Sequence, residues 1–154
     1  MSDTEEFEEA IAAYRSASIE LDQQRQRIAQ WSNDLINIWG QDLLIIARVA
    51  DNILRQVNFS IYAIDRESKG DLRSSISLKS QQPQIYGGTT YQHPTLNFGI
   101  TVDGNVTVKT NAELEGFPRI IPIYDPDRTA KIKTLLADYV KGSLMKMLDR
   151  QRPS

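Results

Sequence analysis

Apolar side chains recur every seven residues along the first part of the chain. A repeat of this kind is typical of a helix with one apolar stripe, and that stripe has to be covered by another surface. The companion positions, four residues further on, start with Ile11 and then turn polar. They make the stripe a poor seam for a long coiled coil but an adequate one for a short dimer. The repeating residues are Phe7, Tyr14, Leu21, Ile28 and Leu35.

A second apolar stripe at helical spacing begins at Leu43, so the pattern predicts a helical region over residues 4–58. The two stripes meet around residues 32–40, where Ser, Asn and Asp offer helix caps and Gly40 offers a weak point without any proline. Two arrangements fit: a helical hairpin that turns between 32 and 40, or one long bent helix of about 75 Å. The long helix would leave its stripe uncovered in so small a domain and would imply a partner chain.

Alternating apolar and polar residues then predict antiparallel strands over residues 57–124. Asp103-Gly104 stands between two alternating runs, a pair typical of a tight hairpin turn of type I′. Pro122 cannot donate a ladder hydrogen bond, so we expect the last strand at an edge or a bulge of the sheet. The alternating segments lie near residues 57–66, 72–80, 96–102, 106–108 and 119–124.

Residues 127–150 have a broad apolar face at helical spacing, and Asp125 or Asp127 can cap the start of this helix. Strands grouped together with helices at both ends are typical of an α+β fold. We therefore predict a single α+β domain over residues 1–154. It consists of an N-terminal long helix or helical hairpin, an antiparallel meander sheet of four to five strands, and a C-terminal amphipathic helix packed on the sheet.

Residues 81–94 form the most unusual segment, because they carry no charge and include Tyr86, Tyr91 and the only histidine, His93. The composition predicts a long loop, or a hairpin tip with short strands of its own. Long ordered loops often carry function. These three residues are therefore candidates for a binding surface.

The composition narrows the classes of function. The chain has no cysteine, which excludes disulfides, thiolate metal sites and cysteine nucleophiles. The first residues are acidic, unlike the basic start of a signal peptide, and no apolar run has membrane-spanning length. We expect a cytoplasmic protein without a cofactor, a metal or a membrane contact.

Two weak signals suggest catalysis. The His93 side chain would titrate near neutrality, but a general base needs an orienting acid and a nucleophile within hydrogen-bond distance. Its sequence neighbours supply neither. Asp125 and Asp127 resemble a metal-binding acid pair, yet their place before a helix is explained by capping alone. A small enzyme with a site near His93, Asp125 and Asp127 is therefore an alternative prediction only, and we assign no catalytic residue.

The basic C-terminal helix suggests a second alternative, a nucleic-acid-associated protein. Its residues Lys131, Lys133 and Lys141 do not form one row along the helix. A pI near 5.4 also opposes a large electrostatic footprint on nucleic acid. Nucleic acid is therefore a disfavoured partner.

By elimination, the sequence favours a non-enzymatic protein-binding module of the adaptor, chaperone or inhibitor type. We expect its N-terminal stripe to join two copies into a homodimer, because an uncovered stripe needs a partner. Tryptophan is enriched at interfaces, and the two tryptophans of the chain share roughly one helical face. The predicted interface residues are Phe7, Ile11, Tyr14, Leu21, Ile28, Trp31, Leu35 and Trp39, with Tyr86, Tyr91 and His93 as loop candidates.

Overall fold

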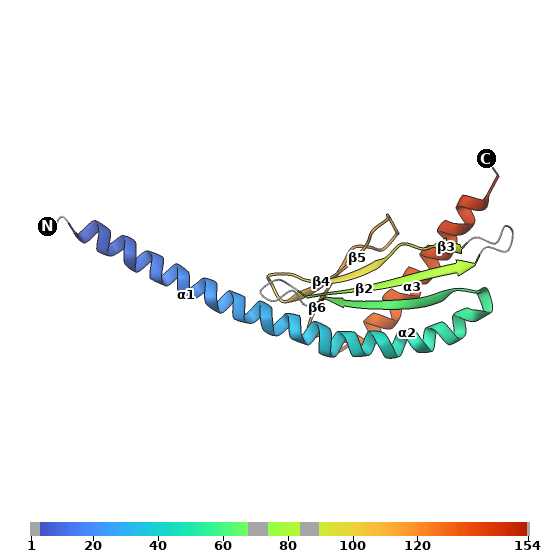
Figure 1. Cartoon of the computed structure of the whole chain (residues 1–154), viewed down its shortest axis with the longest axis horizontal. Coiled ribbons are helices and arrows are strands. Elements are labelled where there is room, and N and C mark those ends of the chain that lie inside the picture. The colour runs from blue at the N-terminus through green and yellow to red at the C-terminus, as the bar shows by residue number, and fades with distance from the viewer. Residues whose placement is uncertain (1–3, 68–73, 84–89, 154) are drawn as a thin grey trace.

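The computed structural model of the chain has an α+β architecture, as the sequence predicts (Figure 1). It describes residues 4–67, 74–83 and 90–153. A long helix at the N-terminus leads into an antiparallel sheet, and a second long helix follows the last strand. No helix in these described ranges combines the length and the apolarity that a membrane crossing requires.

The N-terminal region is one bent helix, so the helical hairpin between residues 32 and 40 is wrong. Gly40 has helical dihedral angles (φ −60°, ψ −39°). A lone glycine costs about 1 kcal/mol inside a helix, which is too little to reverse the chain when the flanking residues pack well. The consecutive segments are α1 (Glu5–Asp34), the π-helical turn η1 (Leu35–Trp39), α2 (Gly40–Leu54) and the 3₁₀ turn η2 (Arg55–Val57).

The π-helical turn η1 explains how the helix stays on the sheet after the seven-residue repeat fails. The repeat would place Asp42 on the stripe after Leu35, whereas the apolar residue there is Leu43. A π turn accommodates one extra residue within a helix. Because η1 absorbs this residue, Leu35, Trp39 and Leu43 all face the core with no exposed surface.

The sheet has six strands among the described residues, one more than the upper end of the predicted four to five. Its lateral order is β1-β2-β4-β5-β6, with β3 also paired to β2, and all pairs are antiparallel. The edge position of the last strand, β6, was expected from Pro122 and is confirmed. The strands are β1 (Ser60–Glu67), β2 (Ser75–Pro83), β3 (Thr90–Gln92), β4 (Leu96–Ile100), β5 (Asn105–Thr110) and β6 (Arg119–Pro122).

The extra strand arises because β3 and β4 are two parts of one interrupted strand. Gln81 of β2 pairs with Ser60 of β1 on one side and with Gln92 of β3 on the other, so β3 and β4 follow the same edge of β2. The interruption contains Pro94, which has no backbone N–H for a ladder bond. The meander order is therefore as predicted.

The turn between β4 and β5 is a hairpin, as Asp103-Gly104 indicates, but its type differs from the prediction. A type I′ turn needs positive φ at both central residues, whereas here only Gly104 has it (φ 79°). The Gly104 amide instead donates to the Thr101 carbonyl at 3.3 Å. A Cβ at Gly104 would lie 2.9 Å from the Trp31 ring, so the close packing of α1 on this turn also requires glycine.

The helices α2 and α3 (Arg128–Gln151) lie on one face of the sheet and form the core with it. Side chains alternate between buried and half-buried along β2 and β4, which is typical of a sheet covered on one face. Trp39 is central: its ring lies 6.3 Å from that of Phe98, and its Nε1–H donates to the Ile123 carbonyl at 2.9 Å. The Arg128–Asp42 ion pair, 2.7 Å long, joins the starts of α3 and α2.

Candidate protein-binding surface

The first part of α1 extends away from the sheet as an isolated helix, which we call the arm (residues 5–27; Figure 1). None of residues 4–31 has a buried side chain. Phe7 is 71% exposed, Ile11 50% and Tyr14 73%. This helix is about 35 Å long, and its apolar stripe is exposed in the part of the chain that the structure describes.

The predicted interface residues are divided between the arm and the core. Leu21, near the end of the arm, is 45% exposed. Ile28 and Trp31 are half-buried where α1 meets the body of the molecule, and Leu35 and Trp39 have no exposed surface at all. The available part of the stripe therefore ends before residue 28.

A second apolar surface lies between α2 and α3, on the side away from the sheet. Ile45, Val49 and Ile53 are exposed by 61%, 59% and 60%. They border a groove of about 650 Å³, the α2–α3 groove. Its described lining residues are Ile45, Ile46, Val49, Ala50, Ile53, Leu54, Lys133, Leu136, Ala137, Val140, Lys141, Leu144 and Met145.

Sequence reasoning missed this groove, although α2 carries a signal for it. Leu43 and Ala47 pack on the sheet, while Ile45 and Val49 point away from it. A helix that is apolar on more than one side needs cover on more than one side. Ile45 and Val49, which lie off the stripe that begins at Leu43, therefore indicate a second contact surface.

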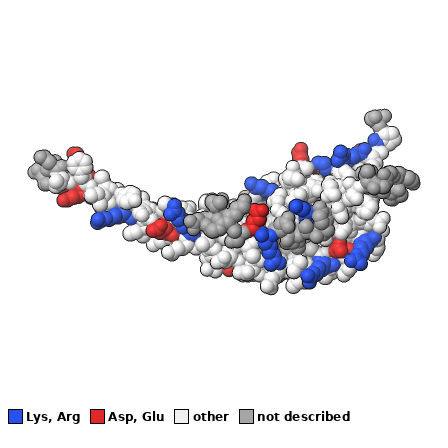
Figure 2. Space-filling model, viewed as in Figure 1, with Lys and Arg blue, Asp and Glu red and all other residues white. Residues whose placement is uncertain are grey.

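The charges of these two surfaces differ in sign. Acidic residues gather at the outer end of the arm, where the first turn of α1 contains Glu5, Glu6 and Glu8 (Figure 2). Lys133 and Lys141 are exposed on α3, and they are the charged residues among the described lining of the α2–α3 groove. Neither lysine forms an ion pair with a described residue.

His93, one of the loop candidates, is buried within the body. Its ring contacts those of Phe59 and Tyr91, each with a centroid distance of 4.7 Å. Its Nε2 lies 3.2 Å from the Gln82 side-chain oxygen. The side-chain amide nitrogen of Gln82 donates to the Val57 carbonyl. Burial lowers the pKa of His93 to about 4, and the nearby Ser143 backbone opposes part of this shift. The ring is therefore neutral at pH 7 and packs against Phe59 and Tyr91.

Of the other two loop candidates, Tyr91 packs against His93. Tyr91 is 8% exposed, and the Arg150 guanidinium lies 5.3 Å from its ring centroid. Tyr86 lies outside the described residues. A hollow of about 360 Å³ includes Tyr91, His93, Lys146 and Arg150, and no acidic residue is among its described lining.

Asp125 has a structural role at the start of α3. Its side chain accepts hydrogen bonds from the Lys131 ammonium and from the Asp127 amide, and these contacts lower its pKa. His93 lies beside Ser143, about 18 Å further along α3 than Lys131. The structure therefore separates His93 from Asp125 and Asp127 instead of bringing the three together.

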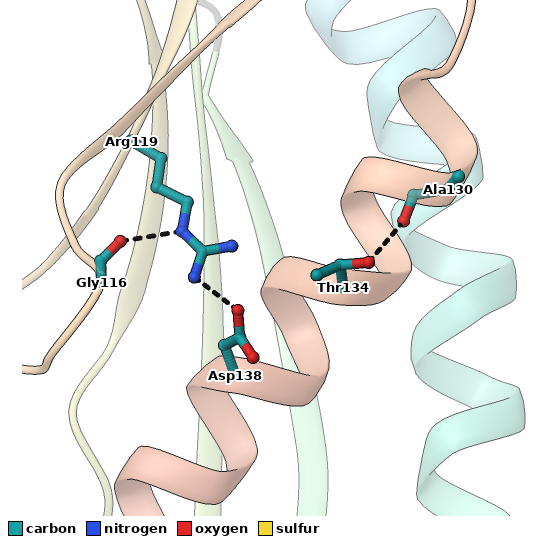
Figure 3. Close-up of polar contacts among 5 residues, drawn as sticks. All are labelled: Gly116, Arg119, Ala130, Thr134 and Asp138. Carbon is teal, nitrogen blue, oxygen red and sulfur yellow. Dashed lines mark hydrogen bonds and ion pairs between the residues drawn. The ribbon is translucent and has the colours of Figure 1, made fainter.

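A hollow also lies between β6 and α3, and Figure 3 shows polar contacts beside it. The Arg119 guanidinium beside it donates to the Gly116 carbonyl at 2.8 Å and to Asp138 at 2.5 Å. Thr134 donates to the Ala130 carbonyl one turn earlier. These contacts fasten the edge strand β6 to α3, so the polar groups shown in Figure 3 are engaged within the chain.

The basic residues of α3 do not share one surface. Lys133 and Lys141 border the α2–α3 groove, whereas Lys146 and Arg150 line the hollow beside His93. Lys131 is paired with Asp125, and Arg152 with Asp149. Within the described ranges, no three potential metal ligands of the His, Cys, Asp and Glu types are grouped.

Comparisons with known proteins suggest no function for this chain. A scan against protein-family models finds no match, and searches of the curated proteins and of the solved structures find none either.

Proposed function

We propose that this protein is a protein-binding module whose recognition element is the arm, and that the arm joins two copies of the chain. The observation that carries this proposal is the exposed apolar stripe of the arm, on which Phe7, Ile11 and Tyr14 are each at least half exposed. Contiguous apolar surface of this kind marks a protein contact site.

The form of the arm supports binding to a protein. Amphipathic helices are recognised when residues at i, i+4 and i+7 enter an apolar groove. Phe7, Ile11 and Tyr14 have this spacing. None of the arm's residues is buried, so a partner would supply packing that stabilises it.

Light scattering over a series of protein concentrations tests the proposal. We expect the native chain to reach twice its mass of 17.5 kDa as the concentration rises. The variant Phe7→Ala/Tyr14→Ala removes two large side chains from the stripe and should raise the dissociation constant at least tenfold. A native chain that is monomeric throughout the series would contradict self-association.

Ile19→Ala is the matched control. Ile19 is also on the arm and is 59% exposed, but it lies about 120° around the helix from Phe7. This variant should associate within twofold of the native chain. Equal losses in both variants would mean that arm hydrophobicity in general, and not the stripe, drives association.

A further inference from the structure

We infer that the α2–α3 groove is the site that receives the arm of a second copy of this chain. Phe7, Ile11 and Tyr14 of the arm would pack against the α2 residues of the groove. This inference rests on the proposed function, and it adds the receiving surface to it.

The groove offers an apolar surface that is uncovered in the chain. Ile45, Val49 and Ile53 follow each other at four-residue intervals along α2, and each is about 60% exposed. Leu144 and Met145 of α3 form the opposite wall. Exposed apolar residues arranged contiguously between two helices mark a docking site for a third helix.

The two surfaces match in length. Phe7 to Tyr14 spans about 11 Å along the arm, and Ile45 to Ile53 spans about 12 Å along α2, because each residue advances an α-helix by about 1.5 Å. Three successive apolar residues of the arm can therefore contact three successive apolar residues of the groove.

The two surfaces also match in charge. Glu5, Glu6 and Glu8 lie beside Phe7 at the start of the arm. Lys133 and Lys141 border the groove, and neither is paired with a described residue. Opposite charges around an apolar contact favour one partner and orientation over others.

The occupant has to come from another molecule. Phe7 and Ile45 are 38 positions apart on one uninterrupted helical path, which corresponds to about 55 Å. The arm of one chain extends away from its own α2 and α3 (Figure 1). It would have to break the helix in order to enter its own groove.

Charge substitution in the groove is the first test. Val49→Glu places an acid in the groove. It should raise the dissociation constant of the dimer at least tenfold, as measured by light scattering. Gln41→Glu is the control, because Gln41 is exposed on the same helix but is outside the groove lining. Gln41→Glu should associate within twofold of the native chain, and far-UV circular dichroism should show that both variants are folded.

Mixing two defective variants separates this inference from arm-to-arm pairing. Phe7→Ala/Tyr14→Ala retains its groove, and Val49→Glu retains its arm. If the arm enters the groove, each variant is monomeric alone and an equimolar mixture forms a complex of twice the chain mass. If arms pair with each other, Val49→Glu associates like the native chain. That result would overturn the groove assignment while leaving the proposed function intact.

Cysteine crosslinking provides a measurement that does not depend on the stability of Val49→Glu. The native chain contains no cysteine, so introduced thiols report specific contacts. Chains with Ile11→Cys mixed with chains carrying Val49→Cys should form a mixed disulfide dimer under mild oxidation. A dimer of Ile11→Cys chains alone, with no mixed product, would overturn the inference. A native chain that is monomeric at every concentration would contradict the proposed function itself.

Discussion

The two halves of the long N-terminal helix carry the same kind of apolar stripe in opposite environments. In the arm, Phe7 and Tyr14 are more than 70% exposed. Further along the same helical region, Leu35, Trp39 and Leu43 have no exposed surface and belong to the core. Helical periodicity therefore indicates a surface that can be covered, whereas the surface that covers it depends on where the rest of the chain lies.

Truncation of matched aromatic residues should show the largest difference between the halves. Trp39→Ala leaves a cavity in the core and removes the hydrogen bond to the Ile123 carbonyl, so it should lower the free energy of unfolding by about 3–5 kcal/mol. Phe7→Ala should change it by less than about 0.5 kcal/mol, because Phe7 is exposed.

Urea denaturation, at a concentration where light scattering shows a monomer, measures both values. Trp39→Phe is a milder core variant in case Trp39→Ala does not fold, and it should fall between the other two. A loss of several kcal/mol for Phe7→Ala in the monomer would mean that the arm packs on its own chain.

Acid should act on the body of the molecule through His93. Its pKa is lowered to about 4 in the folded chain, from 6.5 for the free side chain, because burial opposes the charged ring. Between these values the unfolded chain binds more protons, so stability should fall as the pH drops from about 6.5 towards 4. The slope for one proton approaches about 1.4 kcal/mol per pH unit.

The variant His93→Phe, which keeps a ring beside Phe59 and Tyr91, isolates this proton. Its free energy of unfolding, measured by urea titration at several pH values, should depend less on pH in that window. Identical slopes for the variant and the native chain would contradict the assignment of the pH dependence to His93.

Glycine substitution should give the smallest difference between the halves. Replacing alanine by glycine costs about 1 kcal/mol of helix stability wherever it occurs. Ala47→Gly lies in the packed half, where Ala47 is 4% exposed, and should lower global stability by about this amount. Ala13→Gly lies in the exposed arm and should leave global unfolding unchanged, because the arm can fray locally.

Amide hydrogen exchange of the monomer distinguishes these two effects. Ala13→Gly should accelerate exchange within the arm alone, whereas Ala47→Gly should accelerate it throughout the sheet. Exchange in the native arm that is as slow as in β2 would show that the two halves are equally stable, and would remove the contrast.

The local pattern determined which segments form helices and strands, since their periodicity reflects contacts within one element. It predicted the α+β class, the edge strand at Pro122 and the helix after Asp127. It did not show that Gly40 continues a helix, because this outcome depends on packing around η1. It also predicted at least one strand fewer, because the pairing of both β3 and β4 with β2 is a long-range contact.

The same division applies to the candidate surface. The spacing of Phe7, Ile11 and Tyr14 along the chain already places them on one stripe, because helix geometry brings residues at this spacing to one side. That this stripe is exposed while Trp39 is buried follows from tertiary packing, since the sheet extends under one half of the helix and not under the other. Tertiary packing also decides that Val49 of α2 faces a groove, because α3 lies next to α2 although some 90 residues separate them in the chain.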